Sequence, residues 1–228
     1  MNEPGRSQKR QEADWFLLGL LGIGIVMAVF TFWLDQPSYW WISTHEAKPL
    51  KNVAGLLSKY GDTPELMLIA FVALTACWWA RWKKAFMIVL CVLLGATIAG
   101  GAVNAIRLTS GRARPNNKEA IQEWNGPWHD GEWTIPKNKY NSFPSGHTAG
   151  AFGFFGVLVF ARLSYAALAV IPAVAIGWSR FYLGAHHLSD VWIGMLAGLV
   201  TAFLVWHKAG PWIEKKLNDL AHFRTVRG

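Results

Sequence analysis

Six apolar runs, separated by polar segments, restrict the fold of this 228-residue chain more than any other feature. Several approach the roughly 20 residues that a helix needs to cross about 30 Å of hydrocarbon, and Trp and Tyr flank the shorter ones. Because a membrane interior offers no water to unpaired backbone groups, each run is expected to be a helix. The runs lie at about 15–34, 65–80, 85–106, 148–163, 166–183 and 191–206. The predicted fold is all-α: one domain over residues 1–228, built as a bundle of six transmembrane helices with interfacial amphipathic helices.

The composition agrees with a membrane protein. Hydrophobic residues make up 53% of the chain and charged residues only 16%, which is unusual for a soluble domain of this size. The formal charge is +8, but the basic residues are scattered between apolar runs, so a nucleic-acid interface is not expected. Cys77 and Cys91 both fall inside apolar runs, which leaves neither a disulfide framework nor a CxxC motif.

The distribution of charge predicts how the bundle is oriented. The side with both termini carries twelve of the 22 Lys and Arg but five of the 14 Asp and Glu; the other side has ten and nine. By the positive-inside rule, a leader of about 1–14 and a tail of about 207–228 face the cytoplasm. The first run lacks a cleavage pattern and is interpreted as an uncleaved anchor. The expected location is the plasma (inner) membrane, crossed several times.

Two segments on the outer side and the tail contain further aromatic and apolar residues. Residues 36–64 have apolar side chains at helical spacing, which predicts an amphipathic helix at the lipid surface, and Asp62 or Thr63 is expected to cap the second run. Residues 116–143 form a long loop with several Trp, either interfacial aromatics or a lid that contacts a headgroup. The tail is predicted to form another interfacial helix.

Three polar segments fall on the same outer side: RLTSGRARP (107–115), FPSGHT (143–148) and SRFYLGAHHLSD (179–190). Arginines close to the membrane are costly, so several together indicate an anionic partner, and guanidinium groups match phosphate oxygens. The Pro-Ser-Gly sequence predicts a tight turn before a helix, whose free amides also favour an anion. Gly146 would let the backbone approach a ligand closely.

Histidines in these segments supply candidate chemistry. His186 and Asp190 are four residues apart, so they would share a face if the local chain is helical, and His147 could protonate a leaving oxygen. His187 lies three residues before Asp190, and spacing alone does not separate it from His186 as the nucleophile. Arg112 is expected to extend to lipid headgroups as an ordinary interfacial arginine. A metal site is not expected, because the arginines would repel a cation.

The three segments resemble the motifs of the type 2 phosphatidic-acid phosphatase (PAP2) superfamily, K-x6-R-P, P-S-G-H and S-R-x5-H-x3-D. The second and third motifs match fully, and the first begins with Arg107 where the family usually has Lys, which replaces a point charge by a fork. The superfamily includes membrane lipid phosphatases and soluble vanadium haloperoxidases, and six apolar runs favour the membrane branch. The matching residues are Arg107, Arg114, Pro115, Pro144, Ser145, Gly146, His147, Ser179, Arg180, His186 and Asp190.

The resemblance implies a role for each matching residue. His186 would be the nucleophile that forms a phosphohistidine, Asp190 would orient it, and His147 would be the general acid. The phosphoryl oxygens would be held by Arg107, Arg114, Ser145, Gly146 and Arg180. Neither a metal nor another cofactor is implied.

The predicted function is hydrolysis of a membrane lipid phosphomonoester or diphosphate at the outer face, in the periplasm or exterior. Undecaprenyl diphosphate, phosphatidylglycerophosphate, phosphatidate and lipid A phosphates are all compatible with the resemblance. Transfer of the phosphate from one lipid to another acceptor is the alternative, and a lipid-phosphate binder or transporter without catalysis is the third hypothesis. The expected partners are the lipid substrate and the bilayer, with no nucleic acid.

Overall fold

The computed structural model describes residues 4–117, 123–135, 137–163, 166–220 and 223. Apart from one small hairpin, their regular elements are helical, so the predicted all-α class is confirmed. The α-helices are α1 (Pro4–Thr44), α2 (Lys48–Tyr60), α3 (Thr63–Trp79), α4 (Lys83–Ser110), α5 (Gly146–Phe160), α6 (Val170–Tyr182), α7 (Leu188–Leu204) and α8 (Gly210–Asp219). The short elements are the antiparallel strands β1 (Trp128–His129) and β2 (Glu132–Trp133), the 3-10 turns η1 (Asn138–Tyr140) and η2 (Ala166–Ala169), and the π-helical turn η3 (Val205–Ala209).

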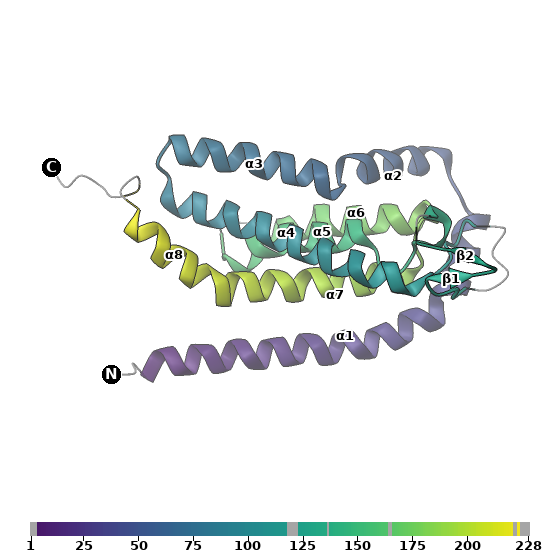
Figure 1. Ribbon diagram of the computed structural model, residues 1–228, viewed down its shortest axis with the longest axis horizontal. Coiled ribbons are helices and arrows are strands. Elements are labelled where there is room, and N and C mark those ends of the chain that lie inside the picture. Colours follow the sequence, from purple (N-terminus) through teal and green to yellow (C-terminus); the bar gives the residue numbers. More distant parts are fainter. Residues whose placement is uncertain (1–3, 118–122, 136, 164–165, 221–222, 224–228) are drawn as a thin grey trace.

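The helices correspond to the six predicted runs. Three helical stretches are long and apolar enough to cross a membrane, Gln11–Thr44, Lys83–Ser110 and Leu188–Asp219. Three shorter apolar helical stretches match the other runs, Thr63–Trp79, Gly146–Phe160 and Ala166–Tyr182. Figure 1 shows these helices packed along the long axis of the molecule, with the start of α1 and the end of α8 at one end and the hairpin β1–β2 at the other.

The first helix is longer than predicted. α1 continues to Thr44 and contains Pro37, so most of the predicted leader and the first part of the segment 36–64 are helical. Hydropathy predicted the end of the run at about residue 34, directly before Asp35, and a carboxylate is costly in hydrocarbon. In the structure the Asp35 side chain is buried against protein instead of lipid, so the helix can continue through it.

The predicted amphipathic helix is present as α2, but it lies along the bundle. Figure 1 shows α2 and α3 placed end to end in the direction of the long axis. Its small residues Ala54 and Ser58 are buried, and the helix packs against α6. Leu50 and Val53 remain exposed, so the face that α2 turns away from the bundle is suited to lipid.

The tail helix continues the sixth predicted helix instead of forming a separate one. α7 passes through the π-helical turn η3 into α8, and the combined stretch is helical over Leu188–Asp219. Ile213 and Leu217 of α8 are buried in the main apolar cluster, so this side of α8 packs against protein, where the prediction had lipid. Residues 221–222 and 224–228 of the tail, and 1–3 of the leader, lie outside the described residues.

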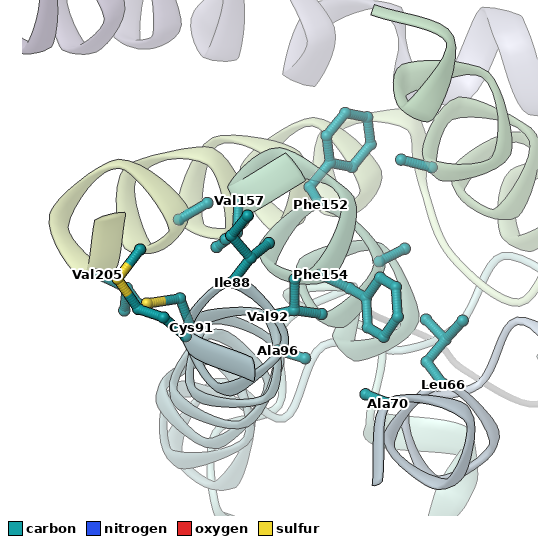
Figure 2. Close-up of a cluster of buried hydrophobic side chains, with 14 of the residues drawn as sticks. Leu66, Ala70, Ile88, Cys91, Val92, Ala96, Phe152, Phe154, Val157 and Val205 are labelled. Atoms are coloured by element: carbon teal, nitrogen blue, oxygen red, sulfur yellow. The ribbon is translucent and has the colours of Figure 1, made fainter. Parts of the chain in front are cut away.

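The main apolar core lies between α3, α4, α5 and the end of α7. Figure 2 shows Val157 of α5 beside Ile88 of α4, and Phe154 of α5 between Val92 of α4 and Leu66 of α3. Helices within a lipid environment associate through close packing of such side chains, since lipid is as apolar as the helices themselves. The core therefore fixes α5 at the centre of the bundle.

Glycines bring the central helix close to its neighbours. A methyl group on Gly198 of α7 would lie 2.6 Å from the Phe152 side chain and 2.7 Å from the Ala149 carbonyl, both in α5. Gly95 of α4 and Gly153 of α5 similarly face each other's backbone. Small residues of this kind allow helix backbones to approach closely. As a result, the start of α5 and the start of α7 lie together at one end of the molecule.

Candidate active site

The three polar segments meet at the end of the bundle where α5 and α7 begin. Backbone hydrogen bonds connect them: the Ser142 amide donates to the Arg112 carbonyl at 3.0 Å, and the Ser145 amide donates to the Asp190 carbonyl at 3.1 Å. Another bond, 3.1 Å long, joins the Asn116 amide to the Gly184 carbonyl. The predicted convergence of segments that are far apart in the sequence is therefore present in the structure.

Ser145 is the N-cap of α5. Its hydroxyl oxygen accepts hydrogen bonds from the Thr148 amide at 3.4 Å and from the Thr148 hydroxyl at 2.9 Å, and its side chain is fully buried. The amides of Gly146 and His147 then occupy the first turn, where a helix has no acceptors of its own for its N–H groups. The turn thus presents backbone donors and the positive end of a helix.

Gly146 lies directly against Arg107. A side chain at position 146 would overlap the terminal guanidinium nitrogen of Arg107 and would lie 3.5 Å from the Asn104 side-chain oxygen. Arg107 also donates to the Pro144 carbonyl at 3.5 Å. The glycine is therefore needed for space, because it lets the last turn of α4 place its arginine across the start of α5.

Three arginines at this end have a buried donor with no partner among the described residues. The Nε atoms of Arg107, Arg114 and Arg180 are all buried and unpaired, although Arg114 also donates to Asn138 at 2.7 Å and Arg180 donates to Ser58. Burial, together with the positive charges of Arg180 and Arg107, lowers the pKa of the Arg114 guanidinium to about 10. Three cations that repel one another and retain free donors have the chemistry that suits an anion with several oxygens.

His186 is buried with one ring nitrogen already bonded. Its Nδ1 atom lies 2.6 Å from the Ser142 carbonyl oxygen, which can only accept, so Nδ1 carries the proton and Nε2 keeps its lone pair. Burial lowers the pKa of the imidazole to about 4, although Asp190 acts to raise it and Arg180 and Arg114 act to lower it further. At neutral pH His186 is thus an uncharged potential nucleophile.

Asp190 lies near His186, but for a different reason from the one predicted. His186 precedes α7, so the two residues do not share a helical face; a turn that ends at the N-cap His187 brings them together. The distance from His186 Nδ1 to Asp190 Oδ2 is 3.7 Å, longer than the bond to the Ser142 carbonyl. The same oxygen accepts from the Ser142 hydroxyl at 2.5 Å and from the His187 amide at 2.8 Å.

His187, the alternative nucleophile, has a structural position. It caps α7, and its Nε2 atom lies 3.1 Å from the Ala113 carbonyl oxygen. His186, by contrast, interacts electrostatically with His147, Arg114 and Arg180. The geometry therefore favours His186 over His187 as the residue next to the anion site.

His147 faces a cavity between α3, α4 and α5. Its Nε2 atom lies 3.3 Å from Asp62 Oδ1, and Asp62 also caps α3 by accepting from the Thr63 amide at 2.7 Å. A cavity of about 410 Å³ is lined by Asp62, Asn104, Arg107 and His147, among others. Sequence reasoning proposed Asp62 only as a helix cap, because nothing in the sequence shows that the turn before α3 lies opposite the start of α5.

Arg112 is the largest departure from the predicted site. It was expected to extend to lipid headgroups, but it is fully buried and donates to Asp190 at 2.5 Å and to Asp35 at 2.6 Å. It also donates to Glu123. The prediction failed because the partners come from α1, the long loop and α7, and such distant pairs leave no local pattern. A carboxylate directly after an apolar run was the one available signal.

The part of the chain that the structure describes contains one group with metal-ligand geometry. Side-chain atoms of Asp35, Glu123 and His187 lie within 4.8 Å of one another. The guanidinium of Arg112 donates to both of these carboxylates, and so it already supplies the positive charge that a bound cation would otherwise provide. The cluster is better described as an arginine site than as a metal site.

The tryptophans of the long loop have different surroundings. Trp124 packs over the Arg112 guanidinium, 4.7 Å from it to the ring centroid. Trp128 and Trp133 form an exposed cross-strand pair on the hairpin, with ring centroids 5.1 Å apart. The first covers a buried side chain of the site although it is itself partly exposed, whereas the hairpin pair suits a membrane interface. Residues 118–122 and 136 of this loop lie outside the described residues.

Comparison with known proteins relates this geometry to a family. The model of the PAP2 superfamily matches residues 86–213. The chain is 37% identical over 83 residues to an Escherichia coli protein named "Putative undecaprenyl-diphosphatase YbjG", which covers 35% of this chain and 42% of that one. It is 24% identical to Lipid phosphate phosphatase 1 of Arabidopsis thaliana, over 98% of this chain and 76% of the relative.

A solved structure has a similar fold. The transmembrane PAP2 type phosphatidylglycerolphosphate phosphatase from Bacillus subtilis superposes with a TM-score of 0.58 at 21% identity, over 83% of this chain and 93% of that one. The Aquifex aeolicus protein LpxE superposes with a TM-score of 0.51 at 20% identity, over 75% of this chain and 94% of its own.

Proposed function

Because the chain belongs to the PAP2 superfamily of membrane lipid phosphatases, we propose that it hydrolyses a lipid phosphomonoester or diphosphate without a metal, through a phosphohistidine. One observation carries the proposal: Arg107, Arg114 and Arg180 each have a buried Nε donor without a partner among the described residues, and the charges of Arg180 and Arg114 act on the buried, uncharged His186. An anion with several oxygens would pair these donors, and a phosphoryl group would then be beside the nucleophile.

In the first step, the phosphoryl group is transferred to the enzyme. The lone pair of His186 Nε2 forms a bond to phosphorus while the bond from phosphorus to the lipid oxygen breaks. His147 donates a proton to that departing oxygen, so the lipid leaves as an alcohol or as a lipid monophosphate. The carbonyl of Ser142 keeps the Nδ1 proton of His186 in place, and the Asp190 carboxylate stabilises the positive charge that the ring gains.

In the second step, water releases the phosphate. His147, now neutral, accepts a proton from a water molecule, whose oxygen bonds to phosphorus as the bond from phosphorus to Nε2 breaks. The products are free phosphate and the original His186. Throughout both steps the three arginines and the first amides of α5 stabilise the charge on the phosphoryl oxygens, the task that Mg²⁺ has in many other phosphoryl-transfer enzymes.

The protein is a multi-pass integral membrane protein, and we propose that its six apolar helical stretches all cross the bilayer. The three shorter ones would do so with flanking aromatic residues in the interface. With cytoplasmic termini, the end of the bundle that holds the site faces the periplasm or exterior. A lipid could then place its headgroup among the arginines while its tails stay in the membrane.

The substrate belongs to the class of phosphorylated membrane lipids. Names of the relatives include an undecaprenyl-diphosphatase, a lipid phosphate phosphatase and a lipid A 1-phosphatase, which agree in the phosphate and differ in the lipid. The panel of candidates therefore remains undecaprenyl diphosphate, phosphatidylglycerophosphate, phosphatidate and lipid A phosphates.

The test is phosphate release in detergent micelles with EDTA present, from each of these four lipids. Wild type is compared with His186→Ala and with His45→Ala, a control at an exposed histidine of α1–α2. We expect release from at least one lipid, complete loss in His186→Ala and no change in the control. Radiolabelled substrate should also leave an acid-labile phosphate on the wild-type protein.

Two results would contradict the proposal. Unchanged phosphate release by a folded His186→Ala protein would contradict a phosphohistidine intermediate at His186. A newly phosphorylated lipid acceptor in place of free phosphate would show that the enzyme is a phosphotransferase.

A further inference from the structure

We propose that Arg112 and Asp35 are positioning residues, which hold the Asp190 carboxylate in its charged form beside His186 and so make the first helix part of the catalytic apparatus. The inference rests on the proposed function. It starts from the contrast between Arg112 and the three arginines of the anion site.

Every nitrogen of the Arg112 guanidinium has a protein acceptor. Nη1 donates to the Ser189 hydroxyl at 2.7 Å and to Asp190 Oδ1 at 2.5 Å. Nη2 donates to Asp35 Oδ2 at 2.6 Å, and both Nε and Nη2 donate to Glu123. The arginines of the anion site each retain a free Nε, whereas Arg112 has no nitrogen left for a ligand. Its function is therefore internal to the protein.

The surroundings of this guanidinium exclude water. The rings of Phe32, Trp124 and Phe143 lie around it, with centroids 5.2, 4.7 and 5.9 Å from its central carbon. Arg112 is fully buried, and the carboxylate of Asp190 is equally inaccessible. Charges in such a place interact more strongly than they do in water, and each requires a partner. Arg112 is the partner that neutralises Asp190.

Asp35 fixes Arg112 and the start of α7 together. Its Oδ1 accepts from the Ser189 amide at 2.8 Å, and its Oδ2 accepts from the Ser189 hydroxyl at 2.6 Å as well as from Arg112. A carboxylate of α1 thus accepts the hydrogen bond of one amide in the first turn of α7, that of Ser189, one residue before Asp190. This geometry holds the first turn of α7 at a set distance from α1.

The contact between Arg112 and Asp190 determines the protonation states of Asp190 and His186. With Arg112 in place, Asp190 is charged and His186 keeps a single proton on Nδ1. Without that positive charge, the uncompensated carboxylate would favour a second proton on His186, and an imidazolium has no lone pair for attack. Loss of Arg112 should therefore move the acid limb of activity to higher pH as well as reduce the maximum rate.

The experiment measures kcat/KM against pH for Arg112→Gln, Arg112→Lys and Asp35→Asn, using the lipid that the wild type hydrolyses. Arg112→Gln should lower kcat/KM by roughly 10- to 100-fold, as is common for residues that orient a catalytic group. It should also shift the acid limb upward by on the order of one pH unit. Arg112→Lys keeps the charge, so its limb should stay near the wild-type position although its rate falls.

Asp35→Asn changes the charge of the cluster in the opposite direction from Arg112→Gln. It removes a negative charge from the cluster, so its acid limb should not move upward even though its kcat falls. Arg162→Gln, at an exposed arginine after α5, is the matched control and should reproduce the wild-type profile. Size-exclusion chromatography and thermal unfolding establish that each variant is folded.

A folded Arg112→Gln or Asp35→Asn protein with the wild-type rate and profile would overturn the inference. An equal fall in rate for Gln and Lys at position 112 with no movement of either limb would also overturn it, because the role would then be purely structural. If Arg112→Gln does not fold, Asp35→Asn decides: an acid limb that moves upward in that variant would overturn the inference. A wild type that releases no phosphate would instead contradict the proposed function.

Discussion

The protonation of one buried histidine should set how activity depends on pH. Burial lowers the pKa of His186 to about 4, so the neutral, nucleophilic form is lost only as the pH falls through that value. In the proposed mechanism His147 must carry a proton to act as the general acid, which adds a limb at high pH, so kcat/KM should be bell-shaped. The measurement is kcat/KM between about pH 3 and 10. A value that rises steadily through pH 9 would contradict His147 as the acid, and an acid limb near 6.5 would contradict a buried His186.

A single methyl group should disturb the anion site. In Gly146→Ala the new carbon would overlap the Arg107 guanidinium, so the arginine must move away from the start of α5. A displacement of about 1 Å in a positioning group can cost roughly 100-fold in rate, and we expect a loss of that order in kcat/KM. The control is Gly55→Ala, where a methyl group meets nothing within 4 Å. Wild-type activity in a folded Gly146→Ala protein would show that Arg107 is not held there.

At the level of helices, the close approach of α5 and α7 should govern stability. Gly198→Ala would place a methyl group 2.6 Å from the Phe152 side chain and 2.9 Å from the Gly153 amide nitrogen, so the two helices must separate. Overpacking of this kind costs about 1–3 kcal/mol, which should lower the melting temperature in detergent. Gly22→Ala, with nothing within 4 Å of the added carbon, should not. Equal melting temperatures would mean that the helices separate without cost.

The helices themselves could be predicted from the sequence, because an apolar run in a membrane has few alternatives to a helix. The ends of these helices could not be predicted in the same way. α1 continues through Asp35 because Arg112 and α7 neutralise that residue, and α7 continues into α8 because a π-helical turn replaces the expected break. The catalytic candidates were visible as short local motifs, whereas Asp62 and Arg112 contact residues more than 70 positions away.

At the scale of the whole molecule, the prediction concerns which end of the helical bundle faces the outside of the cell. In a background with Cys77 and Cys91 replaced by alanine, one new cysteine is introduced at Glu132 of the hairpin or at Lys215 of α8, both exposed. An impermeant maleimide added to intact cells should label Glu132→Cys and leave Lys215→Cys unlabelled until the cells are opened. The reverse pattern would place the site in the cytoplasm.

The unpaired donors of Arg107, Arg114 and Arg180 have a consequence for inhibition by the product. In the proposed reaction these donors would bind the oxygens of the phosphoryl group, and free phosphate offers them the same oxygens as phosphate that is still attached to a lipid. The last species bound in each cycle is therefore also a ligand of the resting site, and inorganic phosphate should compete with the lipid. If the site faces outward as proposed, turnover would then fall as the phosphate concentration of the surrounding medium rises.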